Sequence, residues 1–157
     1  MDSTAELLAE LKQTKPWATL EEEVGVSIAR TAAVVEHAFA DAMREYGITP
    51  TQYNVLRILR GAGQSGLCRN ELRDRLVAPV PDATRLLDRM VEMKLVTRER
   101  DAADKRFVTA RITKAGLDLL NRLDKPVQDL NQRQFSHLGP AKLRQLIDLL
   151  AEVRRRE

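Results

Sequence analysis

The sequence LVTRERDAADKRFVTARITKAG (Leu95–Gly116) contains two short runs rich in β-branched residues and a charged segment between them. The runs are Leu95–Arg98 and Phe107–Ile112, and both are typical of short strands. Thr113 is a good helix N-cap, and apolar residues at helical spacing follow it. The stretch therefore predicts a β-hairpin with a charged tip at 101–106 that leads directly into a helix.

The segment before this hairpin, Gly66–Lys94, contains two short amphipathic patterns separated by Ala78–Pro81. The two prolines of the separator forbid one continuous helix. The second pattern has an inward face of Ala83, Leu86, Leu87, Met90 and Val91 and an outward face of Asp82, Thr84, Arg85, Asp88, Arg89 and Glu92. Asp82, at its start, can cap the helix. A helix of this size fits the major groove of B-DNA, about 12 Å wide, where guanidinium groups can bond guanine edges or phosphates. Helix, turn, helix and hairpin together predict a DNA-binding winged helix-turn-helix.

Several motifs between residues 49 and 116 carry a family resemblance. They are Thr49–Tyr53 (TPTQY), Leu56–Leu59 (LRIL), Thr84–Met90 (TRLLDRM), Leu95–Arg98 (LVTR), Asp101–Arg106 (DAADKR) and Ile112–Gly116 (ITKAG). In this order they resemble the MarR family of winged helix-turn-helix transcriptional regulators, over roughly the central half of the chain. The resemblance implies a mainly α fold with a small β-wing, in which long N- and C-terminal dimerisation helices flank the winged helix-turn-helix.

The whole chain, 1–157, is predicted to be a single domain of this kind. Its DNA-binding lobe is expected at 50–112, and 1–47 and 113–157 are expected to form a helical dimerisation region. An apolar repeat from Leu20 to Tyr46, which Gly47 ends, predicts a long first helix, and Leu138–Pro140 is predicted to start the last one. The long apolar repeats of the flanking helices offer more apolar surface than one small core can use, which predicts a homodimer. Two recognition helices about 34 Å apart would then require a palindromic site.

Charge is distributed unevenly along the chain. Residues 1–56 carry a net charge of −5 and residues 57–111 a net charge of +5. The positive excess therefore lies on the predicted helix-turn-helix and wing, where release of counterions from phosphates would supply affinity. No apolar run is long enough to span a membrane and no export leader is recognised, so the expected location is cytoplasmic. One cysteine and two histidines give no catalytic constellation and no metal-site spacing, so neither an enzyme nor a cofactor is expected.

Arg85 is predicted to read bases in the major groove, with Thr84 beside it. Arg89 lies one turn later, and pairing with Asp82, Asp88 or Glu92 is as good an interpretation as a DNA contact. Arg69, Asn70 and Arg73 on the preceding helix are candidates for contacts with the DNA backbone.

The wing supplies a second group of candidates. Arg98, Arg100 and Lys105 are expected to meet phosphates, although each could also be solvated surface. The resemblance implies that Arg106 enters the minor groove and that Asp104 pairs with Arg106 and orients it.

The family resemblance also raises the question of small-molecule sensing. Trp17, His37, Tyr46 and Tyr53 could line a pocket for a small aromatic effector, although each residue type is more often a core or interface residue. Cys68 is expected at the start of the first helix of the helix-turn-helix, which favours a capping or half-buried residue over a peroxide sensor.

The resemblance implies a homodimeric repressor that covers a palindromic operator and that a small aromatic or phenolic ligand could release. Two alternatives stay open at this point. One is a ligand-independent architectural DNA-binding protein, which would show weak sequence preference. The other is a winged-helix protein-interaction module, which would have a neutral or acidic wing and recognition helix. Repression and activation are not distinguished by the sequence, because the sign depends on where the operator lies.

Overall fold

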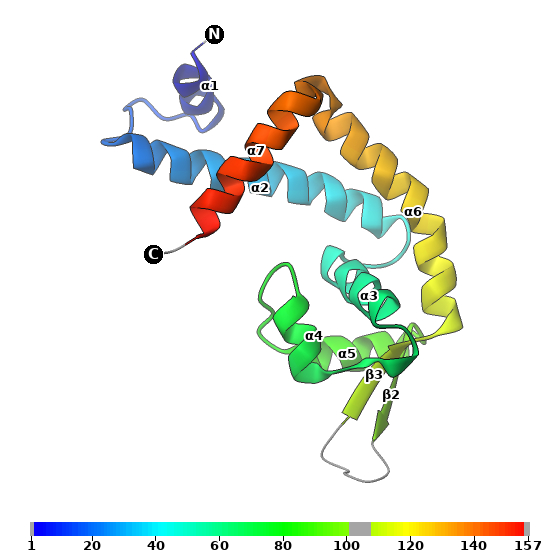
Figure 1. Ribbon diagram of the computed structural model, residues 1–157. Coiled ribbons are helices and arrows are strands. Elements are labelled where there is room, and N and C mark those ends of the chain that lie inside the picture. The colour runs from blue at the N-terminus through cyan, green and yellow to red at the C-terminus, as the bar shows by residue number, and fades with distance from the viewer. Residues whose placement is uncertain (1, 101–107, 156–157) are drawn as a thin grey trace. The chain divides into compact units, whose positions relative to one another are not determined.

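The computed structural model describes residues 2–100 and 108–155 (Figure 1). Its elements are α1 (Ser3–Glu10), α2 (Leu20–Arg44), α3 (Pro50–Ala62), η1 (Gly63–Ser65), β1 (Leu67–Cys68), α4 (Arg69–Arg75), α5 (Ala83–Glu92), β2 (Val96–Arg100), β3 (Val108–Ile112), α6 (Lys114–Phe135), η2 (Ser136–Leu138) and α7 (Gly139–Arg154). Helices dominate, and the strands form one small antiparallel sheet in the order β1-β3-β2. The predicted mainly α fold with a small β-wing is confirmed.

The chain divides into two compact units, residues 1–41 and residues 42–157. In the first unit, α1 is tied to α2 by polar contacts rather than by a buried apolar face. Thr4 Oγ1 donates to Glu23 Oε1 at 2.7 Å, and Arg30 Nε donates to Glu10 Oε2 at 3.1 Å. The sequence analysis did not predict α1, because a helix of eight residues with no buried side chain has no strong apolar period.

The second unit has its core around α3. The largest fully buried side chains are Met43, Val55, Leu56, Leu59, Leu72, Leu87, Met90, Val96, Leu120 and Leu123. A reciprocal capping box begins α3: Gln52 N donates to Thr49 Oγ1 at 3.2 Å, and Thr49 N donates to Gln52 Oε1 at 3.0 Å. Two backbone donors at the helix start are thereby satisfied, which fixes where α3 begins.

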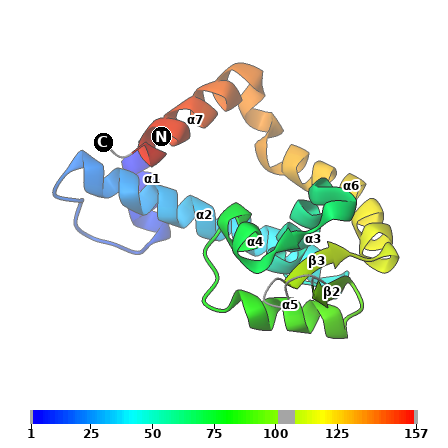
Figure 2. The ribbon, with the colours of Figure 1, turned by 60° about the horizontal axis from the view of Figure 1, so that its bottom comes forward.

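The helix-turn-helix consists of α4 and α5 with the proline-containing turn between them, as predicted. The turn is held to α3 because Val77 N donates to Asn54 Oδ1 at 2.9 Å. Asp82 begins α5 by accepting a hydrogen bond from Arg85 N at 2.9 Å, which confirms its expected cap role. Figures 1 and 2 place α5 beside strands β2 and β3.

The sheet contains one strand more than predicted. β1 pairs with β3 through Leu67↔Ala110 and Cys68↔Thr109, and a strand this short gives no alternating pattern in the sequence. Gly66, just before β1, has φ of +65°, and a Cβ there would lie 2.4 Å from Ala110 O. Glycine is therefore required at this close approach. β2 continues to Arg100, two residues beyond its predicted end.

The flanking helices agree with their predicted starts. Thr113 caps α6 by accepting from Gly116 N at 3.1 Å, and α6 runs through Pro126 to Phe135 as one helix. α2 ends at Arg44 rather than at Tyr46, because the chain makes a turn in which Gly47 N donates to Arg44 O at 3.0 Å. Among the described residues, no helix has the length and apolar content needed to cross a membrane.

Candidate nucleic-acid interface

Helix α5 is strongly amphipathic. Ala83, Leu87 and Met90 are buried against the core, so the opposite side of the helix faces away from it. Val91, which the sequence pattern placed on the apolar face, is 37% exposed. The outward side carries Arg85 and Arg89, and its start is fixed by the Asp82 cap.

Arg85 has a free guanidinium as far as the described residues show: it is exposed and makes no hydrogen bond or ion pair with any of them. It borders a groove of about 590 Å³. The groove is lined by Thr49, Thr51, Gln52, Val80, Pro81, Asp82, Arg85, Leu86 and Arg89. An exposed guanidinium at the start of an outward helix, unpaired among the described residues, can reach a base edge or a phosphate without first breaking a contact with them.

Thr84, Arg69 and Arg89 of the helix-turn-helix have partners. Arg69 Nη1 donates to Thr84 Oγ1 at 3.1 Å, a bond that links α4 to α5. Arg89 Nη1 lies 3.2 Å from Glu92 Oε2, so one of the pairings that the sequence left open is present. Both side chains of that pair are 68% exposed, and a pair this exposed contributes little and can rearrange.

The wing candidates divide into described and undescribed residues. Arg98 is paired with Asp88 of α5, whereas Arg100 is exposed at the end of β2. Arg111 Nη1 lies 2.6 Å from Glu99 Oε2 across the strand pair. The predictions for Asp104, Lys105 and Arg106 lie outside the described residues.

Cys68 occupies the N-cap position of α4, as the sequence analysis expected, and is half-buried. Its backbone N–H donates to Glu71 Oε2 at 2.8 Å, and this bond to the charged form holds the pKa of the Glu71 carboxyl below its usual value. The backbone of Cys68 thus takes part in the hydrogen bonding that begins α4.

The residues predicted to line an effector pocket have different environments. Trp17 is half-buried in the first unit, and His37, in the same unit, is exposed with Nε2 3.5 Å from Asp41 Oδ2. Tyr46 and Tyr53 belong to the second unit, where Tyr46 is half-buried and Tyr53 is buried. An effector site made from the four remains a prediction.

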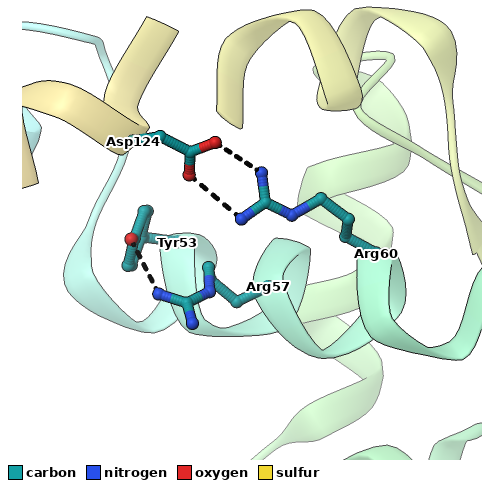
Figure 3. A network of polar contacts seen from close by, with 4 residues as sticks. All are labelled: Tyr53, Arg57, Arg60 and Asp124. Atoms are coloured by element: carbon teal, nitrogen blue, oxygen red, sulfur yellow. Dashed lines mark hydrogen bonds and ion pairs between the residues drawn. The ribbon is translucent and has the colours of Figure 1, made fainter. Parts of the chain in front are cut away.

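Sequence reasoning missed a polar network that joins α3 to α6 (Figure 3). Arg60 donates from both Nη atoms to the carboxylate of Asp124, at 2.9 and 3.0 Å. Beside this pair, Arg57 Nη1 donates to the Tyr53 hydroxyl at 3.2 Å, and its guanidinium lies 5.9 Å from the centre of the Tyr53 ring. The hydrogen bond to Arg60 lowers the pKa of the Asp124 carboxyl, and the same bond raises the pKa of Arg60. No local sequence pattern predicts an ion pair between two residues that lie 64 positions apart.

Comparison with known proteins now adds to this geometry. The family model of the MarR family matches residues 46–106. An uncharacterized HTH-type transcriptional regulator of Bacillus subtilis (strain 168), YkoM, is 34% identical over 122 residues, which are 77% of this chain and 77% of that protein. The chain belongs to the MarR family.

Solved structures agree with membership in the MarR family. A MarR transcription factor from Planctomyces limnophilus is 33% identical, with 86% of this chain and 98% of that chain covered and a TM-score of 0.68. Mutant MarR from E. coli, complexed with operator DNA, is 27% identical, with 88% and 100% covered and a TM-score of 0.77. This MarR-family chain is therefore a DNA-binding transcriptional regulator. No group of three or more His, Cys, Asp or Glu side chains in residues 2–100 and 108–155 could hold a metal ion.

Proposed function

We propose that the protein is a homodimeric repressor that binds a palindromic operator. The observation that carries the proposal is the exposed guanidinium of Arg85, unpaired among the described residues, on a helix whose other face is buried. The N-terminal residues of a recognition helix are those that contact base edges. The net charge of +5 over 57–111 supports the same orientation toward DNA.

In this proposal, the candidate DNA-binding residues make two kinds of contact, with bases and with phosphates. Arg85 and Thr84 read bases, and Arg89 joins them or contacts phosphate after leaving Glu92. Arg100 and Lys105 contact phosphates, and Arg106, oriented by Asp104, enters the minor groove. Arg98 is expected from the sequence to contact phosphate, but its ion pair with Asp88 supports a role in holding β2 to α5.

The dimer part of the proposal is supported by α7. None of its described side chains is buried, and Leu146, Ile147, Leu149 and Val153 are all large, apolar and exposed. An apolar surface of this kind marks an association site. A second copy of the chain is the occupant that makes a two-fold DNA site possible.

Release by a small aromatic or phenolic ligand is the regulatory part of the proposal, and it rests on the family resemblance. Such a ligand acts only through different affinities for the DNA-binding and released states. Titrating candidate aromatic acids into the DNA complex tests this part separately, since a ligand-independent regulator would keep the same DNA affinity throughout.

The experiment that tests the function is selection of bound duplexes from a random DNA pool, followed by affinity measurement at fixed physiological salt. We expect an inverted repeat with half-sites about ten base pairs apart, bound at least about a thousandfold more tightly than a scrambled duplex. Absence of an enriched motif, with only weak and salt-sensitive binding, would contradict the proposal. That result would favour an architectural DNA-binding protein or an interaction module.

A further inference from the structure

The outer half of strand β2 has almost no apolar attachment to the recognition helix α5. Val96 at the start of the strand is 1% exposed, but Thr97, Glu99 and Arg100 are exposed. Side chains alternate between the faces of a strand, so Val96, Arg98 and Arg100 share one face. A groove of about 440 Å³ separates that face from α5, with Asp88, Val91, Glu92, Arg98, Arg100 and Val108 as its lining. Buried apolar packing therefore holds the start of β2 near α5 but does not extend to its outer half.

Within this groove, Arg98 forms an ion pair with Asp88 of α5. The Arg98 side chain is only 26% exposed, in contrast to a freely solvated surface arginine. Its position opposite the buried Ala110 of β3 places the contact halfway along the hairpin, between Val96 and the end of β2.

The other face of the hairpin is held by a matching contact. Arg111 of β3 reaches Glu99 Oε2 at 2.6 Å, and its Nε donates to the backbone carbonyl of Gln64 in η1 at 2.7 Å. Among the described residues, one arginine on each face of the hairpin thus connects it to a neighbouring element. On the face toward the recognition helix, that arginine is Arg98.

We propose that Asp88 is a positioning residue for DNA binding, which acts through Arg98 to set the wing against the recognition helix. The inference rests on the proposed function. A carboxylate on the outward side of a DNA-binding helix repels phosphate, so its presence opposes binding unless it orders other contacts. By holding Arg98, Asp88 fixes strand β2 against α5 and so sets the spacing on DNA between the contacts made by α5 and those made from β2.

The two roles of Arg98 predict opposite effects of one substitution. If Arg98 contacts phosphate and Asp88 is only a surface acid, Asp88→Asn removes a repulsive charge and frees a cation, so affinity for the selected DNA rises. If Asp88 positions the wing, Asp88→Asn lowers that affinity, by about tenfold, which is within the coupling shown by neighbours in one ion-pair network. Glu92→Gln is the matched control, because it makes the same change of charge one turn later on α5 and also frees an arginine, Arg89. We expect no loss of affinity in that variant.

A double-mutant cycle identifies the partner. Once Arg98→Gln has removed the arginine, Asp88→Asn is expected to cause no further loss, because Asp88 acts only through Arg98. Amide hydrogen exchange of the free protein gives a readout that needs no DNA. Exchange at residues 96–100 is expected to speed up in Asp88→Asn and to stay unchanged in Glu92→Gln.

The inference is overturned if Asp88→Asn binds the selected duplex as tightly as the parent, or more tightly, and exchange of β2 is unchanged. A failure of the proposed function gives a different result from a failure of this inference, because the parent protein itself would then select no duplex. The exchange measurement would still decide in that case whether the ion pair holds the wing to α5.

Discussion

The side chain of Arg85 is available to contact DNA because of how the helix α5 begins. Asp82 accepts a hydrogen bond from the backbone N–H of Arg85, which fixes the helix start, and the Arg85 guanidinium has no partner among residues 2–100 and 108–155. We expect Arg85→Ala to cost about 1–3 kcal/mol of binding free energy and to relax the preference at particular base pairs. Anisotropy titrations of the selected duplex and its single-base variants would measure both effects. Arg122→Ala, an exposed arginine of α6, is the control for lost charge, and equal losses in the two variants would refute the base contact.

Gly116 has a packing role that the sequence motif alone does not reveal. A Cβ at this position would lie 2.5 Å from Leu95 O and 2.7 Å from Ile112 Cγ1, at the point where the wing base meets α6. Gly116→Ala should therefore destabilise the protein by about 1–3 kcal/mol, as overpacking does. Denaturant unfolding would measure the change. Gly61→Ala is the control, because nothing lies within 4 Å of a Cβ there and alanine favours a helix such as α3; similar destabilisation in both variants would contradict the steric argument.

Single residues were predicted well where their role is local. Asp82 and Thr113 are caps, and a cap needs only a side-chain oxygen and an N–H three residues later, which the sequence supplies directly. For Arg89 the sequence limited the possible partners to three nearby acids, Asp82, Asp88 and Glu92, and in the structure Arg89 pairs with Glu92. By contrast, the partners of Arg60 and Arg98 lie on other elements, and only the packed fold determines which carboxylate each one meets.

At the scale of elements, α3 and α6 are joined by the ion pair of Arg60 and Asp124. The hydrogen bond to Arg60 holds the pKa of the folded-state carboxyl below that of the unfolded chain, about 3.9. A group with a lowered pKa stabilises the fold at pH values above the unfolded pKa and loses that contribution as the pH falls through the folded pKa. The side chains are 30% and 50% exposed, so the contribution should be modest, about 0.5–1 kcal/mol.

Asp124→Asn should accordingly lower the free energy of unfolding at pH 7, and the difference from the parent should shrink as the pH falls below about 4. Chemical denaturation at a series of pH values would follow this difference. Asp118→Asn removes an i,i+4 pair with Lys114 inside α6 and is the control for loss of a pair that joins no elements. A difference between parent and Asp124→Asn that stays constant down to pH 2 would show that the ion pair is not its source.

Elements were predictable in proportion to their length and periodicity. The two helices of the helix-turn-helix, the hairpin strands β2 and β3, and the long α2, α6 and α7 all leave a pattern that extends over several residues. β1 has only two residues, and it forms where Gly66 lets the backbone approach β3. The only feature of the sequence that could have indicated this strand was therefore one glycine. The end of α2 was placed two residues too late because the apolar period continues into the turn, where Tyr46 remains half-buried.

At the scale of the whole molecule, the proposed site is incomplete in one chain, because a palindromic operator presents two equivalent half-sites. When two DNA-binding lobes are linked in a dimer, binding of the first lobe raises the effective concentration of the second lobe at its half-site. The affinity for the full site therefore depends on the association of the two chains. The apolar residues of α7 are the natural place to test that association.

Ile147 is 57% exposed on α7, and Ile147→Glu would place a carboxylate on the surface proposed to meet the second copy. Burying an unpaired charge is strongly unfavourable, so the dimer dissociation constant should rise at least about a hundredfold. Sedimentation velocity over a concentration series would measure it, and affinity for the full palindrome should fall more than affinity for one half-site. Val77→Glu is the control: Val77 is 89% exposed but lies in the turn of the helix-turn-helix, so its substitution should leave association unchanged. A parent protein that sediments as a monomer at micromolar concentration, or an Ile147→Glu variant that dimerises like the parent, would contradict the use of α7 as the dimer surface.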